Sequence, residues 1–373
     1  MYYLGRVNIS SALPSLETEL GLSKAQSGWF LTGFFLVYAF STLLNGYLGD
    51  RLNPRWFVFT GLVSTALLNL LFGLSSIWLV LLVLWCLNGY FQATGWGPIL
   101  RTLDNSLSTT QKARVSSLFG SSFVAGSALT WLIAGWCAAQ FGWRWAFFVP
   151  AAILLIAAIC WALVIPDQAS SRHSSPAAFF MNLPASLRRY GSLGLCALFV
   201  GLAFGVISLW SPTYFVEAGG LGVGAGSSVA ALLPVAGILG ISLTAWVIER
   251  YFLKREKGVL IVVLLALGTL CLIYSLLPFS LGLAVVGTAL IAAFTYAATT
   301  LVLSTLPLLY AKQGETSGTA GLIDFSFAIG TSLSGVAVGS LLTYFGWSSV
   351  FLGLAAASAL ALVAVSFMSK RPT

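Results

Sequence analysis

The chain has few charged residues. Only 8% of its 373 residues are Asp, Glu, Lys or Arg, whereas soluble globular proteins have about 25%. A fold of this size could not cover a water-facing surface with so few charges, so most of its outer surface must face lipid. The composition excludes a soluble protein and predicts an integral membrane protein, in agreement with the 58% of hydrophobic residues.

Residues that carry catalysis or bind metals are also scarce. The one histidine, His173, lies in the longest polar stretch, and the five cysteines have no metal-ligand spacing. The sequence contains no HExxH and no P-loop motif GxxxxGK[ST]. We therefore expect no enzyme activity, no ATP-driven transport by this chain, no cofactor and no metal.

Long apolar runs recur along the chain, each close to the ~20 residues that a helix needs to cross a bilayer. The opening segment, residues 1–13, would cover only ~20 Å, so we expect a first helix whose front is missing from this chain. Together these runs predict an all-α membrane fold of twelve helices, the first one truncated. The other eleven spans are predicted at residues 26–48, 56–74, 77–99, 115–139, 145–165, 192–214, 226–248, 257–277, 281–309, 317–341 and 347–368.

The basic residues are distributed unevenly between the two sides of the predicted membrane. When the loops alternate from an inside start, fifteen lysines and arginines fall inside, and only Lys24 and Arg144 fall outside. This bias predicts a multi-pass protein of the plasma (inner) membrane with both termini in the cytoplasm. It also explains the net charge of +8 as a topology signal, so we expect no nucleic-acid partner.

Two halves of the sequence resemble each other. The segment "FGWRWAFF" at 141–148 is repeated as "FGWSSVFL" at 345–352, and a polar stretch rich in Ser, Pro and Ala lies between the halves. The sequence predicts a six-helix bundle over 1–165, a central cytoplasmic loop over 166–190 and a second six-helix bundle over 191–373. Parallel repeats of this kind place a substrate path between the two halves.

The segment "GYLGDRLNPR" at 46–55 combines glycines, one acid and two arginines at the cytoplasmic end of a predicted helix. Such a group can join two helices while that face is closed and release them when it opens. A weak echo, "AWVIERYFLKR", follows at 245–255. We predict a cytoplasmic gate formed by Gly46, Asp50, Arg51, Arg55, Glu249 and Arg250.

These features resemble the major facilitator superfamily, whose fold consists of two pseudo-symmetric six-helix bundles joined by a central loop. Within it, "YYLGRVNISSALP", "NGYFQATGWGP" at 88–98 and "LWSPTYF" at 209–215 resemble the organophosphate:phosphate antiporter family. The resemblance implies a transporter that moves a small organic anion by rocker-switch exchange. The anion would be a sugar phosphate, another phosphate ester or a carboxylate, and inorganic phosphate or a proton would be the coupling ion. We expect a monomer.

Two alternatives remain open. The related anion:cation symporters share "RVN", which would imply proton-coupled uptake of carboxylates or sugar acids. Some relatives of the phosphate-ester antiporters resemble sensors that bind an organic anion without transporting it. The family's second substrate arginine aligns with Phe204 here, and a helix-two lysine aligns with Thr42. Because a phosphate dianion favours two or more charge-assisted donors, a single arginine suits a carboxylate or a singly charged ester better.

Two charged residues lie within predicted membrane helices. Arg6 in the first helix is predicted to bind the anion, because a charge near the bilayer centre is costly unless it meets a counter-ion in a wet cavity. The alternative is that Arg6 extends to the cytoplasmic surface. Asp324 is predicted to take up a proton, pair with Arg6 or bind a substrate hydroxyl or amine. The alternative is a neutral carboxyl bonded inside its own bundle.

Polar and aromatic residues in other spans are predicted to complete the wall of the substrate site. Asn88 and Gln92 share one helix face at i, i+4 spacing, and the "GWGP" that follows should bend the helix. The remaining groups need partners for an amide, hydroxyl or indole. The predicted substrate site is Arg6, Asn8, Tyr38, Asn88, Gln92, Trp96, Trp210, Tyr296 and Asp324.

Overall fold

A computed structural model describes residues 1–99, 102, 109–167, 176–252, 255–307 and 316–368, with the side chains of 46, 47, 50, 109–121, 123, 176–188 and 316–318 left undescribed. All secondary structure in these residues is helical. The elements are η1 (Tyr2–Gly5, a 3₁₀ turn), α1 (Asn8–Leu20), α2 (Lys24–Arg51), α3 (Pro54–Leu74), α4 (Trp78–Gln92), α6 (Thr109–Phe141), α7 (Trp145–Val164), α8 (Pro176–Glu217), α9 (Val223–Ala230), α10 (Leu232–Tyr251), α11 (Glu256–Leu276), α12 (Leu281–Thr300), η2 (Leu301–Thr305, a π-helical stretch), α14 (Thr316–Tyr344) and α15 (Trp347–Ser366).

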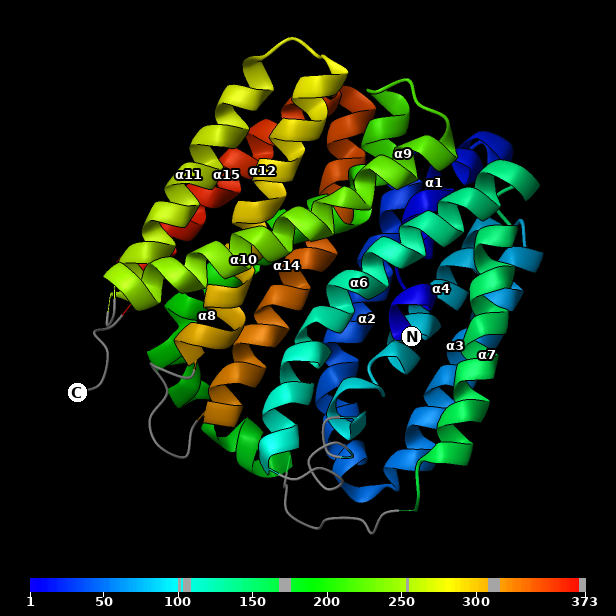
Figure 1. Cartoon of the computed structure of the whole chain (residues 1–373), viewed down its shortest axis with the longest axis horizontal. Coiled ribbons are helices and arrows are strands. Elements are labelled where there is room, and N and C mark those ends of the chain that lie inside the picture. Colours follow the sequence, from blue (N-terminus) through cyan, green and yellow to red (C-terminus); the bar gives the residue numbers. More distant parts are fainter. Residues whose placement is uncertain (100–101, 103–108, 168–175, 253–254, 308–315, 369–373) are drawn as a thin grey trace.

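The helices form two bundles that lie side by side, α1–α7 and α8–α15 (Figure 1). Eleven helical segments of the described residues are long and apolar enough to cross a membrane, and they coincide with the eleven predicted spans to within a few residues at most ends. The predicted bend at "GWGP" is also confirmed, since α4 ends at Gln92 and the helix resumes only after a turn at 93–95. The all-α two-bundle architecture agrees with the prediction.

The first helix is longer than predicted. A 3₁₀ turn over residues 2–5 is followed by a break at Arg6 and Val7, and α1 then continues through Pro14 to Leu20. The predicted end at residue 13 is wrong because Pro14 does not stop this helix. Proline removes one backbone hydrogen bond, but α1 buries a continuous apolar face, so packing outweighs that loss.

The central loop is shorter than predicted. Helix α8 begins at Pro176, so the second part of the predicted loop 166–190 is helical and runs directly into the first span of the C-terminal bundle. Proline is favoured at the first position of a helix, where its missing N–H has no partner to lose. Residues 168–175 of this loop, including His173, lie outside the described residues.

The two ends of the bundle carry different charged groups. We call the end that contains Lys24, Arg144 and Glu217 the outer end, because the distribution of basic residues predicts that it faces away from the cytoplasm. The opposite end, which contains Arg55 and Asp167, is called the inner end. One continuous cluster of buried apolar side chains includes residues of both bundles, so the halves share a core.

Candidate functional site

The break in the first helix positions Arg6. The carbonyl oxygen of Gly5 lies at this break and accepts hydrogen bonds from Asn88 Nδ2 at 2.7 Å and Asn69 Nδ2 at 3.3 Å. On the other side of the break, Asn8 Nδ2 donates to Asn69 Oδ1 and to the carbonyl of Ala146, each at 2.9 Å. Three buried amides from three helices therefore hold the chain on both sides of the arginine.

The Arg6 side chain lies among aromatic rings and one amide. Its Nε donates to Gln92 Oε1 at 3.3 Å, and its guanidinium carbon lies 4.4 Å from the ring centroid of Tyr38 and 5.1 Å from that of Tyr3. Gln92 is itself fixed, since its Nε2 donates to the carbonyl of Tyr2 at 3.0 Å. Ring faces stabilise a cation without neutralising it. Arg6 thus keeps its charge, and none of the ion pairs among described residues involves it.

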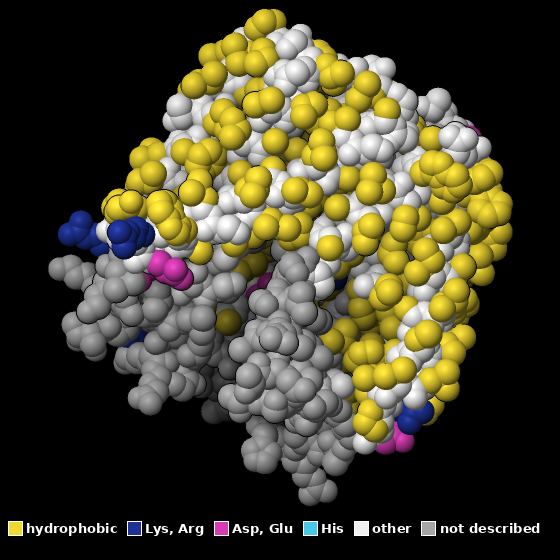
Figure 2. Space-filling view, viewed as in Figure 1, with side chains coloured by type: hydrophobic (Ala, Val, Ile, Leu, Met, Phe, Trp, Pro, Cys, Tyr) yellow, Lys and Arg dark blue, Asp and Glu magenta, His cyan; other side chains and the backbone are white. Residues whose placement is uncertain are grey.

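Asp324 is the acidic residue that interacts electrostatically with Arg6. It lies in the inner half of α14, a helix that packs against both α2 and α8, yet its side chain is exposed. Arg6 and Asp324 attract each other electrostatically across the two bundles, although no ion pair joins them. Figure 2 shows a hollow between the two halves, with an acidic side chain inside it. A charged group that solvent reaches so deep in the fold is available to a ligand.

The C-terminal bundle adds an aromatic wall to the site. Phe204 packs against Tyr296 and Phe327, with ring centroids 5.4 and 5.3 Å apart. Tyr296 is close enough to Tyr3 for the two phenols to interact electrostatically. The position where the family resemblance leads one to expect a second arginine is therefore part of an apolar surface. The C-terminal half presents rings and one carboxylate to the site.

The structure brings only some of the predicted wall residues together. Arg6, Tyr38 and Gln92 are in direct contact. From the other half, Asp324 interacts electrostatically with Arg6, and Tyr296, which is buried in the core, interacts with Tyr3. The predicted residues that do not join them are Asn8 and Asn88, which are fully buried and hold the helix break, Trp210, which is fully buried in the core, and Trp96, which is 53% exposed.

Ion pairs join the two halves at the outer end. The Lys24 ammonium at the start of α2 contacts the carboxylates of both Glu17, in its own half, and Glu217, in the other half. Glu217 also accepts a hydrogen bond from Trp347 Nε1 at 3.2 Å. We call Glu17, Lys24, Glu217 and Trp347 the outer latch. Each charged member keeps a partner in its own half, so the single bond from Lys24 to Glu217 can break without isolating either charge.

Below the outer latch, helices α2 and α14 interlock. Thr32 Oγ1 donates to the Ser332 carbonyl at 2.7 Å, and Ser332 Oγ donates back to the Thr32 carbonyl at 2.9 Å. A Cβ atom added to Gly335 would lie 2.4 Å from the carbonyl oxygen of Gly28. The pair α6 and α9 is similarly tight, since a Cβ on Gly135 would lie 2.3 Å from Cβ of Ser227. Two helix pairs therefore close the outer half of the interface.

The predicted inner gate is only partly described. Arg55 forms an ion pair with Asp167, Nη1 to Oδ2 at 3.3 Å, and Asn53 Nδ2 donates to Asp167 Oδ1 at 2.7 Å. Among the described residues, the acidic partner of Arg55 is thus Asp167, which follows α7 in the same half. Three other predicted gate residues, Arg51, Glu249 and Arg250, are exposed at helix ends. The surroundings of the remaining two, Gly46 and Asp50, lie outside what the structure describes.

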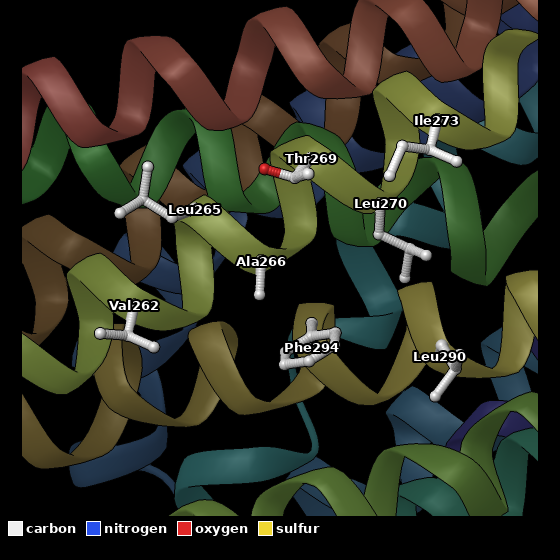
Figure 3. A pocket seen from close by; sticks show the side chains of 8 residues that line it. All are labelled: Val262, Leu265, Ala266, Thr269, Leu270, Ile273, Leu290 and Phe294. Atoms are coloured by element: carbon white, nitrogen blue, oxygen red, sulfur yellow. The ribbon is translucent and has the colours of Figure 1, made fainter.

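A separate groove of about 520 Å³ lies between α11 and α12 (Figure 3). Its lining is almost entirely aliphatic, with Phe294 and the hydroxyl of Thr269 as the exceptions. Several of these side chains, such as Val262 and Leu290, also form the exposed apolar face of the C-terminal bundle. None of its lining residues is charged, so this groove offers no counter-ion to an anion.

Sequence reasoning missed several residues of the site. Asn69 lies in the middle of an apolar span, so the criterion that selected Asn8 and Asn88 could have found it. No sequence pattern indicates the ring of Tyr3 or the outer latch, because these residues meet only in the folded protein. Lys24 and Glu217, for example, are separated by 193 positions in the sequence.

Comparisons with known proteins agree with this architecture. A family model described as "Major Facilitator Superfamily" matches residues 1–335. The glycerol-3-phosphate transporter of Bacillus subtilis (strain 168) is 28% identical over 393 residues, covering 97% of this chain and 88% of that protein. The membrane sensor protein UhpC of Escherichia coli (strain K12) is 24% identical over 406 residues, covering 99% and 89%.

The fold also matches solved structures. A bacterial homologue of the human lysosomal transporter Spinster, in an inward-facing and unoccupied conformation, superimposes with a TM-score of 0.78 over 100% of this chain and 96% of that one, at 16% identity. At that identity the likeness concerns the fold alone. The family model covers most of the sequence, and the two bundles and the eleven spans agree with it. The chain belongs to the Major Facilitator Superfamily.

Proposed function

We propose that this protein is a secondary transporter that moves a small organic anion across the membrane by alternating access. The observation that carries this proposal is Arg6, a guanidinium held at a helix break between the two halves with no carboxylate paired to it in the described structure. A planar guanidinium binds carboxylate or phosphate through two parallel N–H donors. The relatives that carry the names of organophosphate transporters support an organic anion as the substrate.

The arrangement of the outer end supports a state that is accessible from the inner side. Ser332, where α14 interlocks with α2, is eight residues from Asp324, about 12 Å along the helix. Solvent nevertheless reaches Asp324. Because the outer half of the interface is interlocked, access to Asp324 comes from the inner half. Transport then requires the α2–α14 and α6–α9 contacts to separate while contacts at the inner end form.

Orientation and coupling are part of the proposal. The excess of basic residues at the inner end supports a plasma (inner) membrane protein with cytoplasmic termini. Inorganic phosphate or a proton would be the coupling ion, and the unit would be a monomer. The inner gate would include Gly46, Asp50, Arg51 and Arg55 of the first half, with Glu249 and Arg250 in the second.

The test is counterflow into sealed proteoliposomes that contain the purified full chain. Vesicles are loaded with unlabelled inorganic phosphate, glycerol 3-phosphate or a hexuronate, and labelled glycerol 3-phosphate or hexuronate is added outside. The proposal predicts saturable, transient accumulation of at least one labelled anion, absent from empty vesicles. Saturable binding without counterflow would contradict transport and indicate a sensor instead.

A further inference from the structure

We propose that the substrate is a zwitterion, with one anionic group bound by Arg6 and one ammonium group bound by Asp324. This inference rests on the proposed function and narrows the class of its substrate. It starts from the charges of the membrane-embedded part. Within the candidate spans of the described residues, Asp324 is the one charged residue more than three positions from a span end. Arg6, in the shorter first helix, is its counterpart.

The charges of the described residues at the site sum to zero. Phe204, Tyr296 and Phe327 form the C-terminal wall where the family resemblance leads one to expect a second cation. Arg6 contributes one positive charge and Asp324 one negative charge. A ligand with two negative charges would gain from Arg6 and be repelled by Asp324. A ligand with one charge of each sign would neutralise both groups without adding net charge to the site.

Asp324 is placed to receive a cation. Its side chain is exposed in the middle of the fold and takes part in no ion pair among the described residues. The guanidinium of Arg6 and the phenol of Tyr3 interact electrostatically with the Asp324 carboxylate. An isolated carboxylate here is costly, and an ammonium group removes that cost through a charge-assisted hydrogen bond.

The geometry also explains why Arg6 and Asp324 do not neutralise each other. Arg6 is held on its own half by Gln92 and by the ring of Tyr38, whereas Asp324 belongs to the other half. The two charges attract but form no ion pair. A ligand that bridges them would connect the halves through their opposite charges. Such a bridge forms only when one ligand molecule carries both an anionic group and an ammonium group.

The experiment compares two ligands of matched size and one negative charge each, β-alanine, which also carries an ammonium group, and butyrate, which has a methyl group in its place. Affinities are measured by titration calorimetry on the purified full chain. The wild type should bind β-alanine at least about tenfold more tightly, because its ammonium group forms a charge-assisted hydrogen bond with the Asp324 carboxylate. Asp324→Asn should remove this preference and bind butyrate more tightly than the wild type does.

Controls separate this inference from the proposed function. Glu19→Gln, which removes a carboxylate at the outer end, should leave the ratio of the two affinities unchanged. If Arg6→Gln abolishes binding of both ligands while Asp324→Asn leaves their ratio unchanged, anion recognition stands and the zwitterion inference is wrong. Tighter binding of butyrate by the wild type, or failure of β-alanine to bind at all, would also overturn it. An unchanged ratio with loss of pH-driven uptake would instead assign Asp324 to proton transfer.

Discussion

Replacing Gly335 with alanine is expected to open the outer end of the transporter. The added Cβ would lie 2.4 Å from the carbonyl oxygen of Gly28 and 2.6 Å from Oγ1 of Thr32, both on the opposite half. No side chain can rotate away to relieve the backbone contact. The clash exists only while α2 and α14 are interlocked, so the substitution destabilises the closed outer end relative to the open one.

The size of the effect follows from the contact distances. Over-packing of a well-packed interface costs about 1–3 kcal/mol, which corresponds to a roughly five- to 150-fold shift of the conformational equilibrium. The hydrogen bonds between Thr32 and Ser332 at the same contact would weaken as the helices separate, and each contributes about 1 kcal/mol. We therefore expect the outer-open state to become a major population.

Pulsed electron paramagnetic resonance between two spin labels measures this shift. The labels are placed at Ile77 and Leu277, exposed positions at the outer end of each half, after replacement of the native cysteines. Gly335→Ala should move the distance distribution to longer values. Gly282→Ala is the matched control, because a Cβ there meets nothing within 4 Å. An unchanged distribution in a folded Gly335→Ala protein, or an equal change in the control, would refute the reasoning.

Two further predictions concern other contacts of the site. Glu217→Gln removes the charge of the cross-half ion pair in the outer latch. Because this pair is partly exposed, the same labels should report a shift of only about fivefold or less, and a shift larger than that of Gly335→Ala would contradict this ranking. Asn69→Ala removes the amide that holds both Gly5 and Asn8, and should lower the free energy of unfolding by roughly 1–3 kcal/mol. Thermal unfolding in detergent measures this loss, and Thr60→Ala, an exposed change on the same helix, should leave the midpoint unchanged.

The membrane spans could be predicted from the sequence because they depend on local composition. A run of about 20 apolar residues is sufficient evidence for a spanning helix, and the eleven segments follow that rule. The end of the first helix was mispredicted at Pro14 because the packing that stabilises α1 comes from other helices. The start of α8 was missed because the segment after Pro176 is rich in loop-forming residues as well as helix formers.

The functional site could be predicted in part. A charge inside an apolar span is conspicuous, which identified Arg6 and Asp324. The sequence could not indicate whether a buried amide faces the substrate or another helix. Asn8 and Asn88 have the same character as Gln92, and all three donate to backbone carbonyls, yet Gln92 also accepts a hydrogen bond from Arg6. Only the three-dimensional arrangement distinguishes an amide that contacts the proposed substrate-binding arginine from one that holds two helices together.

The most direct test of the account is the affinity of Arg6 variants for the anion that shows counterflow. Arg6→Lys keeps the charge but loses the planar pair of donors, so its dissociation constant should rise at least about tenfold, and Arg6→Gln should abolish saturable counterflow while the protein remains folded. Wild-type affinity and counterflow in Arg6→Gln would contradict the claim that this arginine anchors the substrate.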